Sequence, residues 1–407
     1  MSWAKTVRSR AVASWCALAV AAALGAASCQ NGTSPAAAGS ASPSASSTPS
    51  RAATPAAQIQ VSPAAGSRSV RPDQPITVSA QGGRLSTVTV ADADGDEIAG
   101  TFSADRAQWK SSERLAVRTT YTVRAAASNA AQEETREVAK LRTLTPDDTA
   151  DYALLPSDSR TVGVGMPVVV QFAGLVDESR RAAIEKHVSV KTTPAVRGSW
   201  GWLDARQLVW RPASYWKPGT RVSVKADIAG LETRKGVWTK HDASTSFRIG
   251  SAMVSTVDVK RHTLTVRRDG KVLRVIPITA GKRGFETRNG VKVILSRETS
   301  RQMDAETTGL KKSDPEYYNV NVKYAMRLTW SGEFLHAAPW SVGSQGRANV
   351  SHGCTGMSTA NARWLFERSK MGDVVKYVGS DRPLESYNGY TMWNMPLSDW
   401  AKQSALA

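Results

Sequence analysis

The chain has 407 residues, with 53 lysines and arginines against 35 acidic residues, a formal net charge of +18, and only three cysteines. This length is too great for one compact core and fits two or three domains. Three cysteines exclude a disulfide-stapled fold, and the basic residues are dispersed rather than gathered in one block, which argues against a nucleic-acid-binding protein.

The N-terminal segment is typical of an export signal. A basic start is followed by a mostly apolar stretch over residues 11–27, and Ala26-Ala27-Ser28 lead directly to Cys29. This pattern predicts a signal peptide over residues 1–28 rather than a membrane span. Cys29 stands where bacterial lipoproteins carry their acylated cysteine, with Ala26 in place of the usual leucine. Simple cleavage nearby is the alternative to lipidation.

Residues 29–58 predict a flexible linker. The segment after Cys29 consists almost entirely of Ala, Ser, Thr, Pro and Gly, with Arg51 as the single charge up to residue 58. Such a composition cannot bury a core, so we expect a tether between the N-terminus and the folded part of the chain.

Two segments, residues 59–145 and 146–250, look like copies of one fold. Trp109-Lys110 is followed by an alternating run at 121–125, and Trp210-Arg211 is followed at identical spacing by a run at 222–226. Short alternating runs with Gly, Pro and Asp turns predict two immunoglobulin-like β-sandwiches, with a short helix over 178–187 in the second. We expect four tryptophans to pack in its core and edges, a carbohydrate platform being the alternative: Trp200, Trp202, Trp210 and Trp216.

Residues 251–378 predict a third, β-rich domain. Arg268-Asp269-Gly270 is typical of a hairpin turn, and a helix is expected over 359–370, with Ser358 as its N-cap and Gly372 after its end. The polar segment 297–321 is expected to form a lid, disorder being the alternative. In the C-terminal segment, residues 379–407, we expect four aromatic side chains to pack back on the folded part: Tyr387, Tyr390, Trp393 and Trp400.

Cys354 is the one cysteine beyond the linker. It lies in Ser351-His352-Gly353-Cys354, eighteen residues after His336. A thiol with nearby imidazoles and a glycine has the parts of a cysteine nucleophile site, because the imidazole can take the thiol proton and glycine lets backbone N–H groups face an oxyanion. A position just before the predicted helix favours the ionised thiol. The alternative is an inert, buried cysteine.

The run from Phe334 to Gly343, together with the cysteine motif, resembles the L,D-transpeptidase (YkuD domain) family, cysteine enzymes that cross-link bacterial peptidoglycan. Fourteen residues separate His336 from Ser351, as the family pattern requires. The lipoprotein-like start, the two sandwiches and the tryptophan-containing tail are similar to actinobacterial, mycobacterial-type members. The resemblance implies a mainly β chain, with two tandem immunoglobulin-like sandwiches followed by a β-rich YkuD-type catalytic domain with a short helix.

The resemblance assigns roles to residues of this sequence. It implies that Cys354 is the nucleophile and that His336, oriented by the backbone carbonyl just after it, is the general base and later the acid. His352 is expected to hold the turn, its use as the base being the alternative. Backbone N–H groups of Gly353 and Cys354 would bind the oxyanion with help from Tyr318. Four residues would line the donor-peptide pocket: Met303, Ser331, Gly332 and Trp340.

One position departs from the family pattern. Gly356 stands where an asparagine normally ends the motif. We expect this change to remove a substrate hydrogen bond and to add backbone freedom beside the nucleophile.

The resemblance implies an acyltransferase of peptidoglycan biosynthesis, acting in cell-wall organisation and cell shape. A thioester on Cys354 would form with release of D-alanine, and a neighbouring stem would attack it to give a 3→3 cross-link. Alternatives are an L,D-carboxypeptidase, a sortase-like or papain-like peptidase, or a non-catalytic wall-binding lipoprotein.

Expected partners are donor and acceptor stem tetrapeptides, anionic wall polymers, the membrane through the lipid anchor, and carbapenem inhibitors, but not nucleic acid. No cofactor or metal is expected. The protein is expected outside the cytoplasm, lipid-anchored to the membrane and facing the wall.

Overall fold

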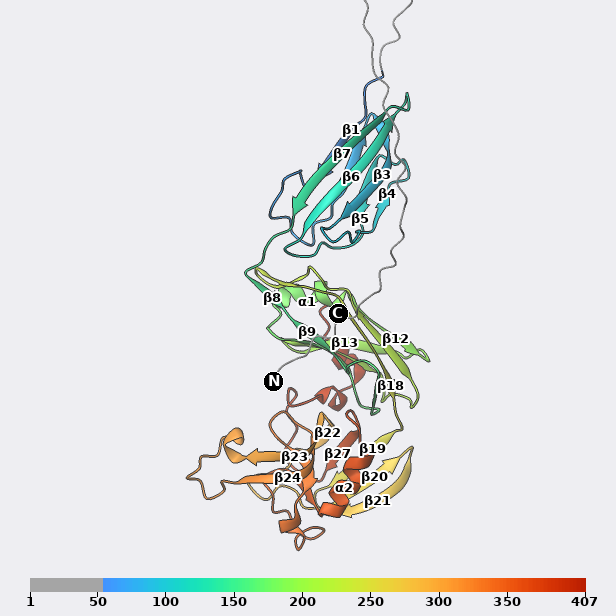
Figure 1. The fold of residues 1–407 in the computed structure, drawn as a ribbon. Coiled ribbons are helices and arrows are strands. Elements are labelled where there is room, and N and C mark those ends of the chain that lie inside the picture. The colour runs from blue at the N-terminus through green and yellow to red at the C-terminus, as the bar shows by residue number, and fades with distance from the viewer. Residues whose placement is uncertain (1–53) are drawn as a thin grey trace, which may run out of the picture. The chain divides into compact units, whose positions relative to one another are not determined.

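The first sandwich is built from two antiparallel sheets. The computed structural model describes residues 54–407, so the predicted signal peptide, Cys29 and most of the linker lie outside the described residues. The sheets have the strand orders β1-β2-β5-β4 and β3-β6-β7, and Trp109 and Tyr121 are buried between them. The strands (blue to green in Figure 1) are β1 (Gln58–Ser62), β2 (Thr77–Gln81), β3 (Gly83–Ala91), β4 (Gly100–Phe102), β5 (Gln108–Ser111), β6 (Thr120–Asn129) and β7 (Glu134–Arg142).

The second sandwich repeats this architecture. Its main sheets have the orders β10-β18-β15-β12 and β13-β14-β11-β9, with a small sheet β16-β17-β8. The elements are β8 (Asp148–Ala150), β9 (Tyr152–Leu155), β10 (Arg160–Val162), β11 (Val168–Phe172), α1 (Glu178–Glu185), β12 (Val188–Thr193), β13 (Gly198–Asp204), β14 (Gln207–Pro212), β15 (Arg221–Ala226), β16 (Glu232–Arg234), β17 (Val237–Thr239) and β18 (Ala243–Ile249).

Strict alternation explains how these strands fold. In β15, Val222 and Val224 point into the core, whereas Arg221 and Ser223 are exposed, as expected for a half-buried strand. Three of the four tryptophans that we considered as a platform are buried, which confirms their place in the core: Trp202, Trp210 and Trp216. Trp200 is half-buried beside them.

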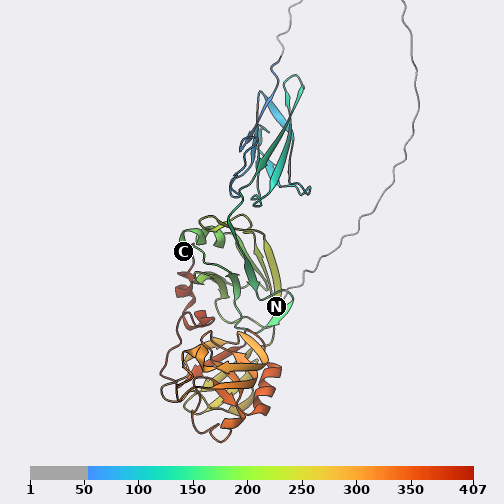
Figure 2. The same cartoon turned by 60° about the vertical axis from the view of Figure 1, so that its left-hand side comes forward.

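The third domain contains two sheets, β21-β20-β19-β27-β22 and β23-β24-β25-β26, which enclose an apolar core together with α2 (Figures 1 and 2). Asp269 and Gly270 have positive φ, so the predicted hairpin turn is confirmed. The elements are β19 (Met253–Asp258), β20 (Thr263–Arg268), β21 (Lys271–Pro277), β22 (Gly290–Val293), β23 (Ser296–Asp304), β24 (Asn319–Arg327), β25 (Phe334–Ala337), β26 (Thr355–Met357), α2 (Thr359–Arg368) and β27 (Val374–Val378), with 3-10 turns at Ala305–Thr308 and Pro339–Ser341.

The helix α2 forms as predicted but ends two residues earlier. Ser358 caps its N-terminus by accepting a hydrogen bond from the Asn361 N–H at 3.3 Å. At the other end, Ser369 has an extended backbone and donates its hydroxyl to the Leu365 carbonyl at 2.8 Å. The helix therefore stops at Arg368 rather than at residue 370.

The polar segment 297–321 is largely a two-stranded ribbon, so the prediction of one long loop was wrong. The ladder between β23 and β24 begins where Ser296 pairs with Arg327 and ends where Asp304 pairs with Asn319. Most side chains of β23 are exposed or half-exposed, and they are polar. The strand therefore lacks the apolar–polar alternation from which a strand is predicted. Only residues 305–318 connect the strands, and a lid role for this connection stays a prediction.

The C-terminal segment packs mainly through its later part. Trp400 is buried and its indole donates to the Ser199 carbonyl at 3.2 Å, and the Trp393 indole donates to the Gly165 carbonyl at 2.8 Å. Tyr390 is half-buried, but Tyr387 is 67% exposed, so its expected packing was wrong. Polar contacts described below hold that part of the segment instead. This segment contains a 3-10 turn at Thr391–Asn394 and the short helix α3 (Leu397–Ala401).

Candidate active site

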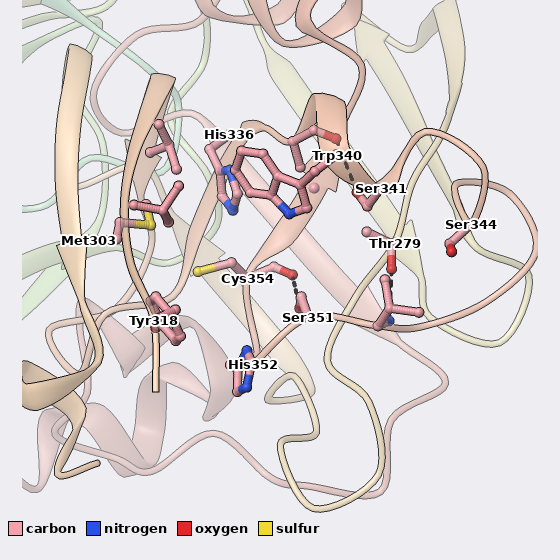
Figure 3. Close-up of a pocket in the computed structure, with 15 residues that line it drawn as sticks. Thr279, Met303, Tyr318, His336, Trp340, Ser341, Ser344, Ser351, His352 and Cys354 are labelled. Carbon is pink, nitrogen blue, oxygen red and sulfur yellow. Dashed lines mark hydrogen bonds between the residues drawn. The ribbon is translucent and has the colours of Figure 1, made fainter. Parts of the chain in front are cut away.

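A cavity of about 470 Å³ opens beside Cys354 (Figure 3). This volume suits a small peptide-sized ligand. Seven of the residues predicted from the sequence line it: Met303, Tyr318, His336, Trp340, His352, Cys354 and Gly356. The fold therefore brings together residues from β23, the position before β24, β25, the 3-10 turn at Pro339–Ser341, the turn before β26 and β26 itself, although they are spread over more than fifty residues.

The turn that carries Cys354 is held by its own hydrogen bonds. The Ser351 hydroxyl donates to the Cys354 carbonyl at 2.6 Å and accepts from the Gly353 N–H at 3.1 Å. Gly353 has φ +120°, a conformation that residues with a side chain rarely adopt. Because the Gly353 N–H is already used within the turn, our expectation that it faces an oxyanion does not hold for this conformation.

Cys354 does not lie at a helix N-terminus. β26 follows it directly, and α2 begins only at Thr359, so the predicted help from the helix dipole is absent. The thiol packs against an apolar cluster that includes Met303 and Phe334. Burial raises the pKa of Cys354 to about 12, although the Phe334 N–H and the charge of Lys292 favour the thiolate. Burial therefore favours the protonated thiol, whereas the expected position before a helix favoured the ionised one.

His336 is fixed in one orientation on β25. Its Nδ1 lies 2.9 Å from the Ala337 carbonyl, the contact expected from the sequence, so Nδ1 carries the proton of the neutral ring. The Nε2 atom is then free to accept a proton. Burial lowers the pKa of His336 below its ordinary value of 6.5, so the ring is neutral at pH 7.

The sulfur and the imidazole face one cavity without a direct hydrogen bond in this conformation. Figure 3 shows the His336 ring above Cys354, with Met303 and Tyr318 beside the sulfur. The thiol donates to the Gly332 carbonyl at 3.5 Å. A rotation of the Cys354 side chain is therefore required before the imidazole can take the thiol proton.

His352 is engaged on the wall of the cavity. Its Nε2 lies 2.7 Å from the Glu316 carboxylate, which also accepts from Lys282 at 2.6 Å. The ring contacts Phe285 edge-on, with centroids 4.6 Å apart, and Tyr318 at 5.0 Å. These contacts fit the expected holding role rather than the alternative role as base.

Gly356 is held on both sides, so the expected backbone freedom is absent. It pairs with His336 in the parallel ladder of β25 and β26, and it exchanges two hydrogen bonds of 2.9 Å with Thr279. A Cβ atom at this position would lie 2.9 Å from the Ala338 Cβ and 3.1 Å from the Thr279 Cγ2. The space of an asparagine side chain is therefore taken by these two neighbours.

Tyr318 contributes a hydroxyl group to the cavity. Burial raises its pKa to about 12, so the hydroxyl keeps its proton and remains a donor. Gly332 does not line the cavity as predicted, and neither does Ser331. Its hydroxyl and N–H are bound to Asn388 at 2.8 and 2.9 Å.

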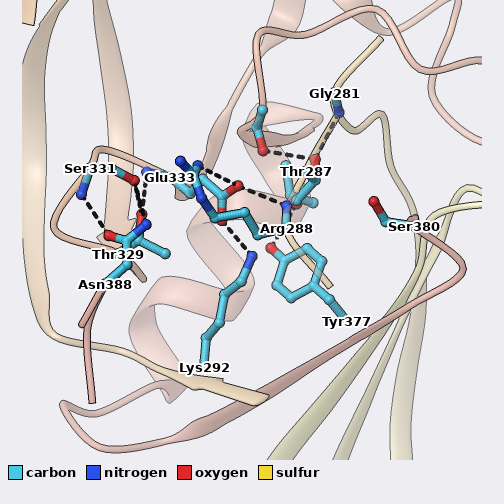
Figure 4. Close-up of polar contacts among 12 residues, drawn as sticks. Gly281, Thr287, Arg288, Lys292, Thr329, Ser331, Glu333, Tyr377, Ser380 and Asn388 are labelled. Carbon is cyan, nitrogen blue, oxygen red and sulfur yellow. Dashed lines mark hydrogen bonds and ion pairs between the residues drawn. The ribbon is translucent and has the colours of Figure 1, made fainter. Parts of the chain in front are cut away.

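A buried charged network behind the cavity was missed by the sequence analysis (Figure 4). Lys292 has a fully buried side chain and is paired with Glu333, whose side chain is 5% exposed. Glu333 also accepts from the Arg288 N–H at 2.9 Å and from its guanidinium at 3.2 Å. Arg288 in turn binds Glu385 of the C-terminal segment at 2.6 Å.

This network adjoins the reactive turn. Glu333 lies between the Gly332 carbonyl, which contacts the thiol, and Phe334, the first residue of β25. Asn388 links Glu385 to Ser331 through hydrogen bonds of 2.8 Å. The C-terminal segment thus anchors the loop that meets Cys354. Nothing in the alternating pattern of β22 distinguishes Lys292 from an exposed lysine.

Within residues 54–407, no group of three or more His, Cys, Asp or Glu side chains could hold a metal ion. Over the same range, no helix has the length and apolar character needed to cross a bilayer.

Comparisons with known proteins agree with the domain architecture. Residues 67–232 match the bacterial Ig domain, and residues 252–376 match the L,D-transpeptidase catalytic domain, called YkuD. A solved structure of the LD transpeptidase LdtMt1 in complex with imipenem is 36% identical, with a TM-score of 0.49, and covers 57% of this chain and 100% of that one.

Two curated relatives extend over most of the chain. L,D-transpeptidase 5 of Mycobacterium tuberculosis (strain ATCC 25618 / H37Rv) is 31% identical over 359 residues, covering 86% of this chain and 78% of the relative. L,D-transpeptidase 2 of Mycobacterium tuberculosis (strain CDC 1551 / Oshkosh) is 34% identical over 351 residues, which is 86% of this chain and 85% of the relative. With two immunoglobulin-like sandwiches before a YkuD catalytic domain, this chain belongs to the L,D-transpeptidase family.

Proposed function

We propose that the protein cross-links peptidoglycan by 3→3 transpeptidation, with Cys354 as the nucleophile. One observation carries the proposal. The only cysteine of residues 54–407 shares a cavity with a neutral histidine, His336, whose Nδ1 is bound to a carbonyl and whose Nε2 is free. A thiol and an imidazole in this state form a nucleophile and base pair.

The first half of the reaction transfers the stem peptide to the enzyme. The thiol proton passes to Nε2 of His336 as the sulfur attacks the carbonyl of the third residue, a diamino acid, in a tetrapeptide stem. The carbon–nitrogen bond to D-alanine then breaks, and the imidazolium returns the proton to the leaving amine. Because the pKa of Cys354 is raised and that of His336 is lowered, proton transfer accompanies the attack rather than preceding it.

The second half releases the enzyme. The free amine of a neighbouring stem attacks the thioester, loses a proton to His336, and the sulfur leaves as a thiol. Developing negative charge on the carbonyl oxygen is met by the Tyr318 hydroxyl and by the Cys354 N–H, which has no acceptor among residues 54–407. Water in place of the amine would make the reaction an L,D-carboxypeptidation.

Product analysis tests this proposal. The protein is incubated with a disaccharide-tetrapeptide, and the products are separated by mass. The proposal predicts dimers that lack one terminal D-alanine. Wild type and His241→Gln, a control at an exposed histidine, should form these dimers, whereas Cys354→Ala and His336→Gln should not. Tripeptide without dimer would establish a carboxypeptidase. No turnover by a folded wild-type protein would favour a non-catalytic wall-binding protein.

The same chemistry predicts a covalent adduct with a carbapenem. The strained β-lactam carbonyl can replace the stem carbonyl as the target of the Cys354 sulfur, and its ring nitrogen remains attached after the bond breaks. Intact mass after incubation with imipenem should increase by one molecule of the drug. The increase should be absent in Cys354→Ala.

We also propose that the protein is exported, acylated at Cys29 and held at the outer side of the membrane, facing the wall. The support is the order of a basic start, an apolar stretch and small residues before Cys29. Growth with a labelled fatty acid should mark the wild-type protein and not Cys29→Ala. A labelled Cys29→Ala protein, or a wild-type protein without label in the membrane fraction, would contradict lipidation.

A further inference from the structure

The exposed face of one sheet in the second sandwich carries an unusual concentration of positive charge. The sheet has the order β10-β18-β15-β12, and a groove of about 580 Å³ lies on it. Four basic residues line the groove, and no carboxylate does: Arg160, Lys191, Arg221 and Arg248. We name this surface the basic face. Figure 1 labels two of its strands, β12 and β18.

The strand register places three of these cations, Lys191, Arg221 and Arg248, in adjacent rows, whereas Arg160 lies at the edge of the sheet, opposite Phe247. Arg221 lies directly opposite Arg248 in the β15–β18 ladder, and Thr161 and Thr193 extend the same row at its two ends. In the next row, Lys191 lies opposite Ser223, which lies opposite Ser246. Neighbouring strands are about 4.8 Å apart, so the charges and hydroxyl groups form a regular array.

Folding alone does not account for this array. Like charges directly opposite each other on a sheet destabilise it. Within residues 54–407, no ion pair satisfies any of the four cations. On the same sheet face, by contrast, Lys225 is paired with Asp227 at 2.8 Å. The core requires only the inward side chains of these strands, such as Val222 and Phe247.

We propose that the basic face binds a linear phosphodiester polymer. Guanidinium groups bind phosphate oxygens in a two-pronged manner, and serine and threonine hydroxyl groups donate to the same oxygens. A row that crosses several strands suits an extended ligand with repeating charges rather than one small anion. The location outside the cell, where such wall polymers occur, rests on the proposed function.

The features of this face favour a polymer over a membrane surface. Membrane-binding surfaces insert apolar side chains between their basic residues. The two apolar residues that line the groove, Val222 and Phe247, are buried in the core and cannot insert. Asp158 is an acidic residue beside the groove, where it accepts the N–H and the hydroxyl of Ser246 at 2.9 and 2.8 Å. Its charge opposes an anionic ligand.

The experiment measures binding of the full chain to end-labelled poly(glycerol phosphate) by fluorescence anisotropy at several salt concentrations. Wild type should bind, with log K falling as log salt rises. Arg221→Gln combined with Arg248→Gln should weaken binding about tenfold and reduce the salt slope by about two. Asp158→Asn should tighten binding. Lys225→Gln, on the same face but already paired, should have little effect.

Several results would overturn the proposal. The first is that wild type does not bind poly(glycerol phosphate). The second is that Lys225→Gln loses as much affinity as the double variant. The third is that wild type binds polyglutamate or anionic phospholipid vesicles as tightly as poly(glycerol phosphate), or more tightly. Circular dichroism and thermal unfolding verify that the variants are folded, which is expected because all the substituted side chains are exposed. Acylation of Cys354 by imipenem, measured on the same samples, does not depend on this surface. A lack of acylation would therefore contradict the proposed function and not the proposed binding of the polymer.

Discussion

The buried pair of Lys292 and Glu333 is expected to control the stability of the catalytic domain. Lys292→Met removes the ammonium group and leaves Glu333 with Arg288 as its remaining charged partner. Breaking a buried ion pair from one side typically costs about 3–5 kcal/mol, because the remaining charge stays desolvated. Since Arg288 still donates two hydrogen bonds to Glu333, we expect the lower end, about 3 kcal/mol.

Hydrogen exchange offers a local readout of this change. The backbone N–H groups where β22 pairs with β27, at Lys292 and Val375, exchange with solvent when this part of the domain opens. A loss of about 3 kcal/mol corresponds to a roughly 100-fold faster exchange of these N–H groups when opening is rapid and reversible. Urea unfolding of the same protein gives the equilibrium value.

Two variants make the reasoning refutable. Lys292→Met combined with Glu333→Gln removes both charges and should recover at least half of the lost stability. Lys376→Met changes an exposed lysine on the adjacent strand β27 and should cost less than about 0.5 kcal/mol. A single Lys292→Met variant as stable as this control, or a double variant less stable than the single one, would refute a structural role for the ion pair.

The remaining predictions concern the base, the altered motif and acid stability. Because burial lowers the pKa of His336 below 6.5, the imipenem acylation rate should fall with acid at a midpoint below pH 6.5; a midpoint above 6.5 would contradict this. Gly356→Asn should destabilise the domain by about 1–3 kcal/mol through overpacking, and Ala338→Gly should partly restore it, as urea unfolding would measure. The Arg288 guanidinium helps to lower the pKa of Glu385 to about 2, so its contribution to stability is present above pH 4.5 and lost as the pH falls toward 2. Glu385→Gln should therefore flatten the acid dependence of unfolding; an unchanged acid profile would count against it.

Local patterns in the sequence predicted much of the fold. Alternation placed Val222 and Val224 in the core, and the turn residues Asp269 and Gly270 marked the hairpin. The ribbon formed by β23 and β24 escaped prediction because its side chains are mostly solvated, so no apolar alternation remains to be read.

The candidate site was predicted in composition but not in electrostatics. The spacing identified Cys354 and His336, and both line one cavity. A three-residue strand after the thiol removes the helix N-terminus that was expected to ionise it. The pairing of Lys292 with Glu333 joins residues forty-one positions apart, so no local pattern could indicate it.

The most direct measurement traps the enzyme during turnover with a disaccharide-tetrapeptide whose side-chain amine is acetylated, so that it cannot serve as an acceptor, followed by acid quench and mass analysis of the peptide that contains residue 354. We predict a thioester on Cys354 that carries the disaccharide-tripeptide, sensitive to hydroxylamine and accompanied by one equivalent of D-alanine. Release of D-alanine without any acylated sulfur, or with the acyl group on another residue, would contradict the central role given to this thiol.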